Sequence, residues 1–331
     1  MVKSNQATTA KPGSRIWPYI QIARPDHWFK NAFMLLGMVL AWFHRPETFA
    51  ADNLPTLLLA VLAACIVSSS NYALNEVLDA PHDSRHPVKK YRPVAAGKIT
   101  PGLGILEWLL LGILGLAMSF AVNWPFGVAA TLLWLMGAAY NTPPIRTKEI
   151  PYVDVLTEAI NNPLRLLMGW FALVGDTIPS TALMLAYWMV GAFLMALKRL
   201  AEYRHIGDKE AATAYRKSFR HYTEERLLVS VFFYMSACSL FAGIFMIRYK
   251  PELIVCVPFL AGFFAYYMKL GFKPDSPVQY PERLYREKKL MLYLVFCVLL
   301  FVALMFTKIP ILEEWFPMTP ADPHILWVLD W

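Results

Sequence analysis

Three polar residues spaced four apart could together bind a cation. Asn75, Asp79 and Asp83 follow an apolar stretch at residues 54–74. If that stretch continues as a helix, the three side chains project from one face. Carboxylate and amide oxygens are hard ligands of the kind that Mg2+ uses, and the phosphates of a substrate can complete its coordination. The row therefore predicts a site for magnesium and a diphosphate, with these three residues as metal ligands.

Basic residues follow the row directly and could bind phosphate oxygens. Guanidinium and ammonium groups make charge-assisted hydrogen bonds to phosphate. A loop that is charged only because it is solvated is the alternative, but acids followed at once by bases at the end of a membrane span favour a binding site. These basic residues are Arg85, His86, Lys89, Lys90 and Arg92.

A second pair of acids lies farther along the chain. Asp154 and Glu158 are again four residues apart, and we expect them to face the same cavity as the first row. Arg146 and Lys148 precede them and could bind phosphate.

Polar residues then continue into the apolar stretch itself, as Asn161, Asn162 and Arg165. Their offsets from Asp154 keep them near one helix face. Because an ionisable residue inside a membrane helix is a functional candidate by default, we expect Arg165 to belong to the site. The alternative is that Arg165 is a structural contact and pairs with Glu158 or Asp154.

A third polar group lies at the end of the apolar stretch at residues 181–198. Lys198, Arg199 and Glu202 lie about one turn apart at the membrane boundary, where a phosphate is neutralised more strongly than in water. The remaining bases of the loop at 198–226, including Arg216, are interpreted mainly as solvated charge. Lys30, at the start of the first apolar stretch, could reach the interface or contact a lipid phosphate.

The composition requires a solvent other than water for much of the surface. Hydrophobic residues make up 57% of the 331 residues and charged residues only 17%, whereas a soluble domain has about a quarter charged residues. Backbone groups in lipid must be paired internally, so the apolar stretches are predicted to be helices. The predicted fold is all-α, a polytopic membrane bundle of nine transmembrane helices near residues 31–45, 54–74, 103–122, 126–141, 152–174, 181–198, 227–247, 252–271 and 290–307.

The basic residues predict the orientation of this bundle. Most of the 31 Lys and Arg residues lie in the segments 1–30, 75–102, 142–151, 198–226 and 270–289. Cytoplasmic loops retain positive charge, so we expect a cytoplasmic N-terminus, an outside C-terminus and a site that faces the cytoplasm from the inner (plasma) membrane. The net charge of +7 is therefore no sign of nucleic-acid binding.

Three regions are predicted along the chain. Residues 1–23 form a polar N-terminal segment, and residues 24–307 form the nine-helix domain. Residues 308–331 form a tail that combines Trp315, Trp327 and Trp331 with prolines and acids. Because tryptophan anchors at headgroup depth, this tail is predicted to be interfacial.

The motifs resemble a known family. Asn75-x-x-x-Asp79-x-x-x-Asp83 is similar to the first signature of the UbiA superfamily of intramembrane prenyltransferases. Four other segments resemble its decaprenyl-phosphate phosphoribosyltransferase branch, and the order and spacing fit over roughly residues 20–307. These segments are Arg24–Asn31, His86–Gly97, Lys198–Glu202, and Arg216–Ser218 with Tyr222 and Thr223.

The resemblance implies an activity. The donor would be 5-phosphoribosyl diphosphate, the acceptor a polyprenyl phosphate, and the cofactor Mg2+, with a second magnesium held through Asp154 and Glu158. The implied catalytic residues are Asp79, Asp83 and Asp154. The side chains expected to bind substrate are Lys30, Asn75, Arg85, Lys89, Arg92, Arg146, Lys148, Glu158, Asn162, Arg165, Lys198, Arg199 and Glu202.

Two other functions stay open at this point. The same fold could transfer a prenyl group from a prenyl diphosphate to an aromatic or lipid acceptor, and the fuller second acidic motif suits that donor. A transporter or channel is the non-enzymatic alternative. It is disfavoured because the sequence has no evident internal repeat and its polar groups gather on one side of the membrane.

Overall fold

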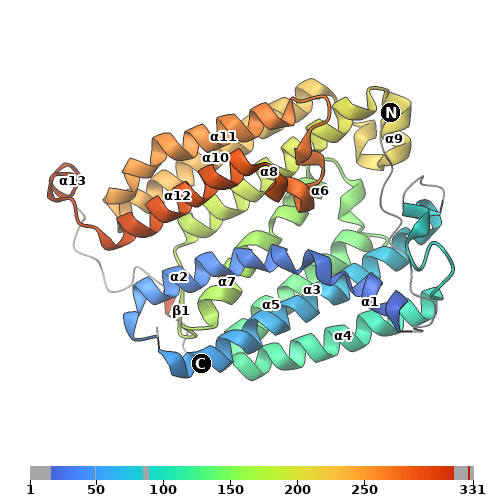
Figure 1. The fold of residues 1–331 in the computed structure, drawn as a ribbon, viewed down its shortest axis with the longest axis horizontal. Helices are drawn as coiled ribbons and strands as arrows, with labels where there is room; N and C mark the ends of the chain where they lie inside the picture. Colours follow the sequence, from blue (N-terminus) through green and yellow to red (C-terminus); the bar gives the residue numbers. More distant parts are fainter. Residues whose placement is uncertain (1–15, 49, 85–88, 317–326, 329–331) are drawn as a thin grey trace.

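The computed structural model describes residues 16–48, 50–84, 89–316 and 327–328, and nearly all of its regular structure is helical (Figure 1). In the list that follows, η marks a 3-10 helix. The first half of the chain forms α1 (Trp17–Ala23), η1 (Pro25–Phe33), α2 (Met34–His44), η2 (Pro46–Thr48), η3 (Ala51–Asn53), α3 (Leu54–Asp83), η4 (Lys89–Tyr91), α4 (Pro101–Val122), α5 (Trp124–Asn141), η5 (Thr147–Glu149), α6 (Val153–Ala159) and α7 (Asn161–Phe171). The second half forms β1 (Thr177–Ile178), α8 (Thr181–Ile206), α9 (Lys209–Tyr215), η6 (Lys217–Arg220), α10 (Glu224–Tyr249), η7 (Pro251–Cys256), α11 (Val257–Gly271), η8 (Pro277–Gln279), η9 (Pro281–Arg286), α12 (Lys288–Phe306), α13 (Pro310–Trp315) and β2 (Trp327–Val328).

Six helical segments of the described chain are long and apolar enough to cross a membrane. They are α3 with η3, α4, α8, α10, α11 with η7, and α12. More than half of the apolar window of α3 is buried, whereas only 17% of that of α4 is. Helix α3 is therefore central, and α4 turns most of its apolar surface outward, as a helix against lipid does.

The other three predicted spans contain shorter or less apolar helices. The first divides between η1 and the 11-residue α2, and the fifth divides into α6 and α7 at Ile160. Pro163 lies just past this break. It has no N–H to donate to the carbonyl of residue 159, so it interrupts the helical ladder. The helical class is as predicted, while the number of nine spans and the sides of the two termini stay predictions.

Two small strands depart from the all-helical prediction. Thr177 pairs with Val328 and Ile178 pairs with Trp327 in an antiparallel ladder. Part of the predicted interfacial tail therefore lies against the loop between α7 and α8.

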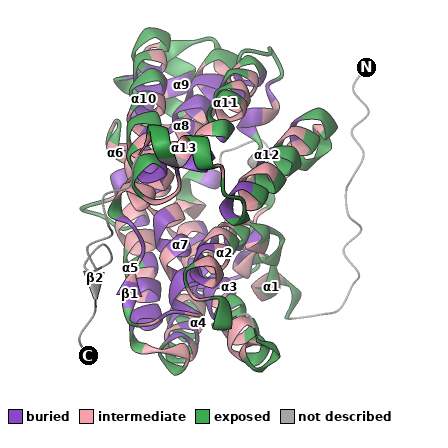
Figure 2. Cartoon of the chain, turned by 90° about the vertical axis from the view of Figure 1, so that its left-hand side faces the viewer, coloured by how far each residue is buried: buried purple, intermediate pink, exposed green. Residues whose placement is uncertain are grey.

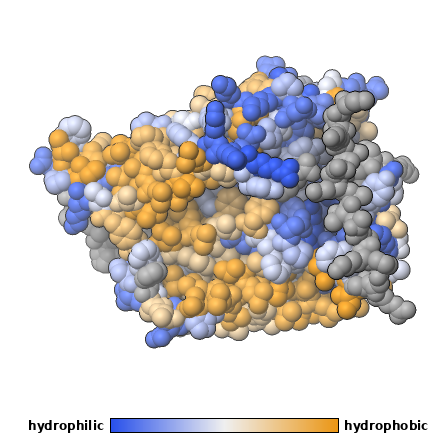
Figure 3. Space-filling view, in the orientation of Figure 1, coloured by the Kyte–Doolittle hydropathy of each residue, from blue (hydrophilic) through white to orange (hydrophobic). Residues whose placement is uncertain are grey.

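The helices form two packed groups. In Figure 1, α2, α3, α4, α5 and α7 lie in the lower half, and α8, α10, α11 and α12 lie in the upper half. One hydrophobic cluster extends from the lower group to Phe245, Leu253 and Leu304, and a second is built mainly from α8, α10 and α11. Figure 2 shows buried residues inside and exposed ones on the outer helix faces. In Figure 3 apolar side chains cover much of the long sides, and hydrophilic ones gather toward the upper right, the end that carries α9.

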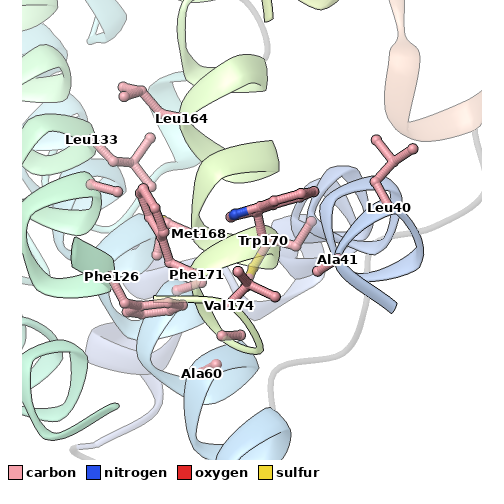
Figure 4. Close-up of a cluster of buried hydrophobic side chains, with 14 of the residues drawn as sticks. Leu40, Ala41, Ala60, Phe126, Leu133, Leu164, Met168, Trp170, Phe171 and Val174 are labelled. Atoms are coloured by element: carbon pink, nitrogen blue, oxygen red, sulfur yellow. The ribbon is translucent and has the colours of Figure 1, made fainter. Parts of the chain in front are cut away.

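Helices α2 and α7 approach each other through two glycines. A Cβ added to Gly37 would lie 2.0 Å from the carbonyl oxygen of Leu166, and one added to Gly169 would lie 2.0 Å from that of Met34. Small residues allow membrane helices to pack backbone to backbone. The contact aligns the side chains of Figure 4, in which Leu40 and Ala41 of α2 lie near Trp170 of α7.

Replacing Gly169 with alanine should therefore destabilise the bundle strongly. The added methyl group meets main-chain atoms, which cannot swing aside as a side chain can, so we expect the free energy of unfolding to fall by about 3 kcal/mol or more. Chemical denaturation in detergent micelles measures this. Gly243→Ala in α10 is the matched control, because an added Cβ there meets no atom within 4 Å. Equal stability of the two variants would contradict the packing described.

Candidate active site

The first acidic row lies on the last turns of α3, as predicted. The helix continues past the apolar stretch to Asp83, so residues four apart share one face. Asn75 Nδ2 donates to Asp79 Oδ2 at 3.3 Å and to Asn141 Oδ1 of α5 at 2.5 Å. The amide of Asn75 thus fixes the start of the row against a neighbouring helix.

Asp79 is held by two basic side chains from the loop after α5. Lys148 Nζ lies 2.5 Å and Arg146 Nη2 lies 3.0 Å from Asp79 Oδ1. Lys148 also donates to Asn141 Oδ1 at 2.9 Å. Burial lowers the pKa of Lys148, and the carboxylate of Asp79 partly offsets this. The two predicted phosphate ligands therefore already surround the predicted metal ligand.

Asp83 is bound in the same way by the loop that follows it. Its side chain is almost fully buried, Arg92 Nη1 lies 2.5 Å from Oδ2, and Lys89 Nζ lies 4.0 Å from Oδ1. Burial lowers the pKa of Lys89, against the opposing effect of Asp83. Lys90 lies over the ring of Tyr91 instead. Arg85 and His86 lie outside the described residues.

The second acidic pair is organised differently from the prediction. Asp154 is fully buried, and both of its carboxylate oxygens accept hydrogen bonds from the protein. Tyr222 Oη donates to Oδ1 at 2.7 Å, while Arg199 Nε at 3.2 Å and Ser218 Oγ at 3.3 Å donate to Oδ2. Burial, and then Asp154, raise the pKa of Tyr222. Asp154 is thus the centre of a polar network rather than a free carboxylate in a cavity.

Arg199 is the main cation of this network. It is 1% exposed, and it contacts Glu202 at 3.0 Å, Asp154 at 3.2 Å and Glu158 at 3.9 Å. These three ion pairs hold the Arg199 guanidinium in place, and its role as a phosphate ligand stays a prediction. Lys198, whose ammonium is 3.9 Å from Glu202, is more accessible.

The loop at 198–226, whose bases are interpreted from the sequence mainly as solvated charge, contributes side chains to this network. Arg216 lies 3.7 Å from Asp154, and Ser218 and Tyr222 are fully buried. The sequence signals for them are the resemblance carried by Arg216–Ser218 with Tyr222, and Phe219, an apolar residue in the middle of the basic run. Lys217 fits the original interpretation, since its side chain is 75% exposed beside Glu149.

The two acidic groups belong to one assembly. Arg216 Nη1 donates to the carbonyl oxygen of Lys148 at 3.4 Å, and the N–H of Tyr152 donates to Tyr222 Oη at 2.5 Å. Arg146 and Tyr152 both have a positive φ, at 32° and 64°. This left-handed conformation is unfavourable for residues other than glycine. The strained loop is therefore held in place by contacts from α3 and from the loop after α8.

Removing the Tyr222 hydroxyl tests this link. In Tyr222→Phe the N–H of Tyr152 and one oxygen of Asp154 lose a buried partner, so the free energy of unfolding should fall by about 1–3 kcal/mol. Denaturation in micelles measures it. Tyr91→Phe is the control. Because Tyr91 is 70% exposed, loss of its hydroxyl should leave the free energy of unfolding unchanged. Equal losses for both variants would contradict the proposed link.

Three further predicted residues lie deeper in the bundle. Arg165 Nε donates to Asn31 Oδ1 at 2.9 Å, and the described residues show no pair between Arg165 and Asp154 or Glu158. The structural-pair alternative for Arg165 is thus corrected. Asn162 packs closely against Gly191 of α8, and the Lys30 ammonium lies 5.7 Å from the ring centre of Tyr72.

The α3 row fits a magnesium ion that is shared with a substrate. Its donors are the hard oxygens of two carboxylates and an amide, on successive turns of one helix. Within the described part of the chain, no three His, Cys, Asp or Glu residues come close enough to hold an ion by themselves. Such a site suits Mg2+, which commonly takes one or two carboxylates and completes its shell with water and phosphates.

Comparison with known proteins shows the family of the chain. The profile of the UbiA prenyltransferase family matches residues 31–280. The chain belongs to this family. Decaprenyl-phosphate phosphoribosyltransferase of Mycolicibacterium smegmatis is 27% identical over 234 residues, 69% of each chain. The protein of the same name from Mycobacterium tuberculosis (strain CDC 1551 / Oshkosh) is 26% identical over 68% of this chain and 72% of its own.

Solved structures show that the UbiA fold extends over most of the chain. A UbiA homologue from Archaeoglobus fulgidus, bound to GPP and Mg2+, superimposes with a TM-score of 0.66 at 20% identity, covering 87% of this chain and 98% of the other. A digeranylgeranylglyceryl phosphate synthase gives a TM-score of 0.62 at 15% identity, covering 88% and 98%. The UbiA family and its fold are thus established for this membrane protein, and family membership favours a transferase over a transporter.

Proposed function

We propose that this UbiA-family protein is a magnesium-dependent transferase that moves a phosphoribosyl group from 5-phosphoribosyl diphosphate to a polyprenyl phosphate. The observation that carries this proposal is the similarity to proteins named decaprenyl-phosphate phosphoribosyltransferase over about two thirds of the chain. The excess of basic side chains supports it. This donor carries a 5-phosphate besides its diphosphate, whereas a prenyl diphosphate has the diphosphate alone.

The acids of α3 have the first role in this proposal. Asn75, Asp79 and Asp83 hold Mg2+, which when bound neutralises the charge that develops on the departing diphosphate. Lys148 and Arg146 exchange their contacts with Asp79 for phosphate oxygens, and Arg92 does the same from Asp83. The bound diphosphate then replaces these internal ion pairs with intermolecular ones of the same kind.

The acids of α6 have a second role. Asp154, whose oxygens are occupied, orients Arg199 and Arg216. Glu158 pairs with Arg199 at 3.9 Å, but its side chain is 31% exposed, so it can also face a metal or substrate. Lys198 and Glu202 lie at the end of the site that takes the ribose.

The reaction needs no nucleophile from the protein. The bond between the anomeric carbon and the diphosphate oxygen breaks, and the electron pair leaves with the diphosphate. A phosphate oxygen of the lipid then bonds to the carbon. Because that oxygen is already ionised, the site requires positioning and electrostatic stabilisation rather than a general base. We place the reaction at the cytoplasmic face of the inner (plasma) membrane.

A labelled-donor assay tests the function. Purified protein in micelles with Mg2+, labelled 5-phosphoribosyl diphosphate and polyprenyl phosphate should yield labelled lipid and free diphosphate. Polyprenol in place of polyprenyl phosphate is the control and should give no product. Absence of labelled lipid, together with consumption of a prenyl diphosphate, would overturn the proposal.

Prenyl transfer is the second candidate. It is favoured by the neighbours of known structure, since the Archaeoglobus fulgidus homologue is described with GPP, DMAPP and Mg2+ bound. In that case Asp154 and Glu158 would take part in a second metal site. The same preparation supplied with a prenyl diphosphate and an aromatic or lipid acceptor distinguishes the two reactions.

Removal of metal gives a further prediction. Dialysis against EDTA should abolish transfer because, without a cation between them, the carboxylates of the α3 row repel the diphosphate. Mg2+ should restore the activity, while Na+ at equal ionic strength should not. Product formation is the measurement. Full activity after chelation would contradict a role for the α3 row in metal binding.

A further inference from the structure

Arg165 is a buried cation whose described partners are all neutral. Its side chain is on α7 and is 8% exposed. Nε donates to Asn31 Oδ1 at 2.9 Å, and Nη1 donates weakly to the carbonyl oxygen of Asn161 at 3.4 Å. Within the described part of the chain, no carboxylate lies within ion-pair distance of its guanidinium. The nearby acids of α6 are paired with Arg199 instead.

A hydrogen-bonded frame holds the guanidinium in place. Asn31 Oδ1 also accepts from Ser68 Oγ at 3.2 Å, and Asn31 Nδ2 donates to Cys65 Sγ at 3.2 Å. Asn31 belongs to η1, Ser68 and Cys65 to α3, and Arg165 to α7. Three segments that are distant in the sequence therefore fix the orientation of one guanidinium, which indicates a preorganised binding site.

A second cation without a carboxylate partner lies close by in η1. The only described contact of the Lys30 ammonium is the face of Tyr72 on α3. Lys30 directly precedes Asn31, the residue that accepts the hydrogen bond from Arg165, so the two cations belong to one region of the bundle. Neither cation has a carboxylate within ion-pair distance in the described part of the chain, whereas Glu158 is paired with Arg199.

An unpaired charge in the interior of a membrane protein is unfavourable, and such residues normally pair or face a functional cavity. An anionic ligand would remove this penalty. Arg165 lies on α7, past the break at Ile160 and seven residues beyond Glu158 in the sequence, and its side chain is buried among the helices. A sugar phosphate can remain at the polar mouth, whereas an anion that carries an apolar chain can reach this depth.

We propose that Arg165, with Lys30, binds the phosphate of the lipid acceptor, separately from the donor diphosphate at the α3 row. The proposal rests on the proposed function, since it names the subsite for its second substrate. Arg165 provides a fixed pair of N–H donors, and Lys30 provides a second positive charge from η1. The chain of the lipid would extend between the helices into the bilayer.

The test compares binding of the two substrates to the full-length protein in nanodiscs. Arg165→Gln should weaken binding of polyprenyl phosphate by at least about tenfold, which is the loss of one charge-assisted contact. It should leave the Kd for 5-phosphoribosyl diphosphate within about twofold. Polyprenol binding, which involves no phosphate, should not change in this variant.

Asn31→Asp is the second variant and separates binding from folding. It keeps the shape of Asn31 and places a carboxylate beside Arg165, so the cation gains an internal partner. We expect an unchanged or higher thermal unfolding temperature, with a loss of polyprenyl phosphate binding similar to that of Arg165→Gln. A purely structural Arg165 would leave lipid binding unchanged in this folded variant.

The outcomes are distinct from those of the proposed function. If the wild type binds neither substrate, the proposed function fails. If the wild type binds both and Asn31→Asp still binds polyprenyl phosphate normally, the subsite is wrong although the function stands. A matching loss of donor binding in Arg165→Gln would also overturn the subsite, because it would place Arg165 with the diphosphate.

Discussion

Asp79→Asn is expected to lower kcat/KM for phosphoribosyl transfer by at least about 100-fold, a loss typical of removing one charge-stabilising group from an active site. Asp79 is the described acid that contacts both Lys148 and Arg146. The asparagine keeps the size of the side chain and one oxygen that can accept from Lys148. The fold should therefore persist while the negative charge that binds Mg2+ is lost. The assay with labelled 5-phosphoribosyl diphosphate measures the effect.

The Mg2+ dependence of this variant shows how the activity is lost. If Asp79 is a metal ligand, the Mg2+ concentration for half-maximal activity should rise in Asp79→Asn. The site then has one charged ligand oxygen fewer and binds the ion more weakly. If Asp79 only orients Lys148 and Arg146, the rate should fall with the Mg2+ dependence unchanged. That second result would contradict the metal assignment and leave the residue a positioning role.

Asp176→Asn is the matched control. Asp176 lies in the loop between α7 and α8 and pairs with Arg45 at 2.6 Å, with both side chains partly exposed. The substitution removes the same charge and also breaks an ion pair, but far along the chain from the α3 row. Activity should stay within about twofold of the wild type, since exposed ion pairs contribute little to stability. A comparable loss in both variants would indicate a general effect of charge.

The α3 row could be predicted because its geometry is local. Residues spaced four apart meet on a helix face whatever the rest of the fold does, and α3 continues to Asp83 as this requires. The break in the fifth predicted span was also present in the sequence, as Asn161, Asn162 and Pro163. The apolar content of residues 152–174 nevertheless predicts one continuous span there.

The partners of the acids could not be predicted in the same way. Lys148 meets Asp79 across 69 positions, and Arg199 meets Asp154 across 45. Such contacts depend on how loops fold over helix ends. The spacing of residue types along the sequence does not predict this. A charged loop at a membrane surface looks the same in sequence whether it is solvated or buried. The resemblance includes Arg216 and Tyr222, but their contacts with Asp154 are evident only in the folded chain.

Arg199→Met is expected to reduce the free energy of unfolding by about 3–5 kcal/mol, as when one partner of a buried ion pair is removed. Methionine fills a similar volume without charge. It leaves the oxygens of Asp154, Glu202 and Glu158 without their shared cation in a site from which water is largely excluded. Denaturation in micelles and the yield of monodisperse protein measure the effect.

The same substitution at Arg204 provides the control on the same helix. Arg204 pairs with Glu224 where both side chains are exposed, so Arg204→Met should lose at most about 1 kcal/mol. Adding Asp154→Asn to Arg199→Met should recover part of the stability, because it removes one uncompensated charge, and the size of that recovery measures the coupling of the pair. If Arg199→Met instead remains as stable as the wild type but cannot bind 5-phosphoribosyl diphosphate, the ion-pair network is secondary. Arg199 would then be the phosphate ligand that its place at the end of α8 first indicated.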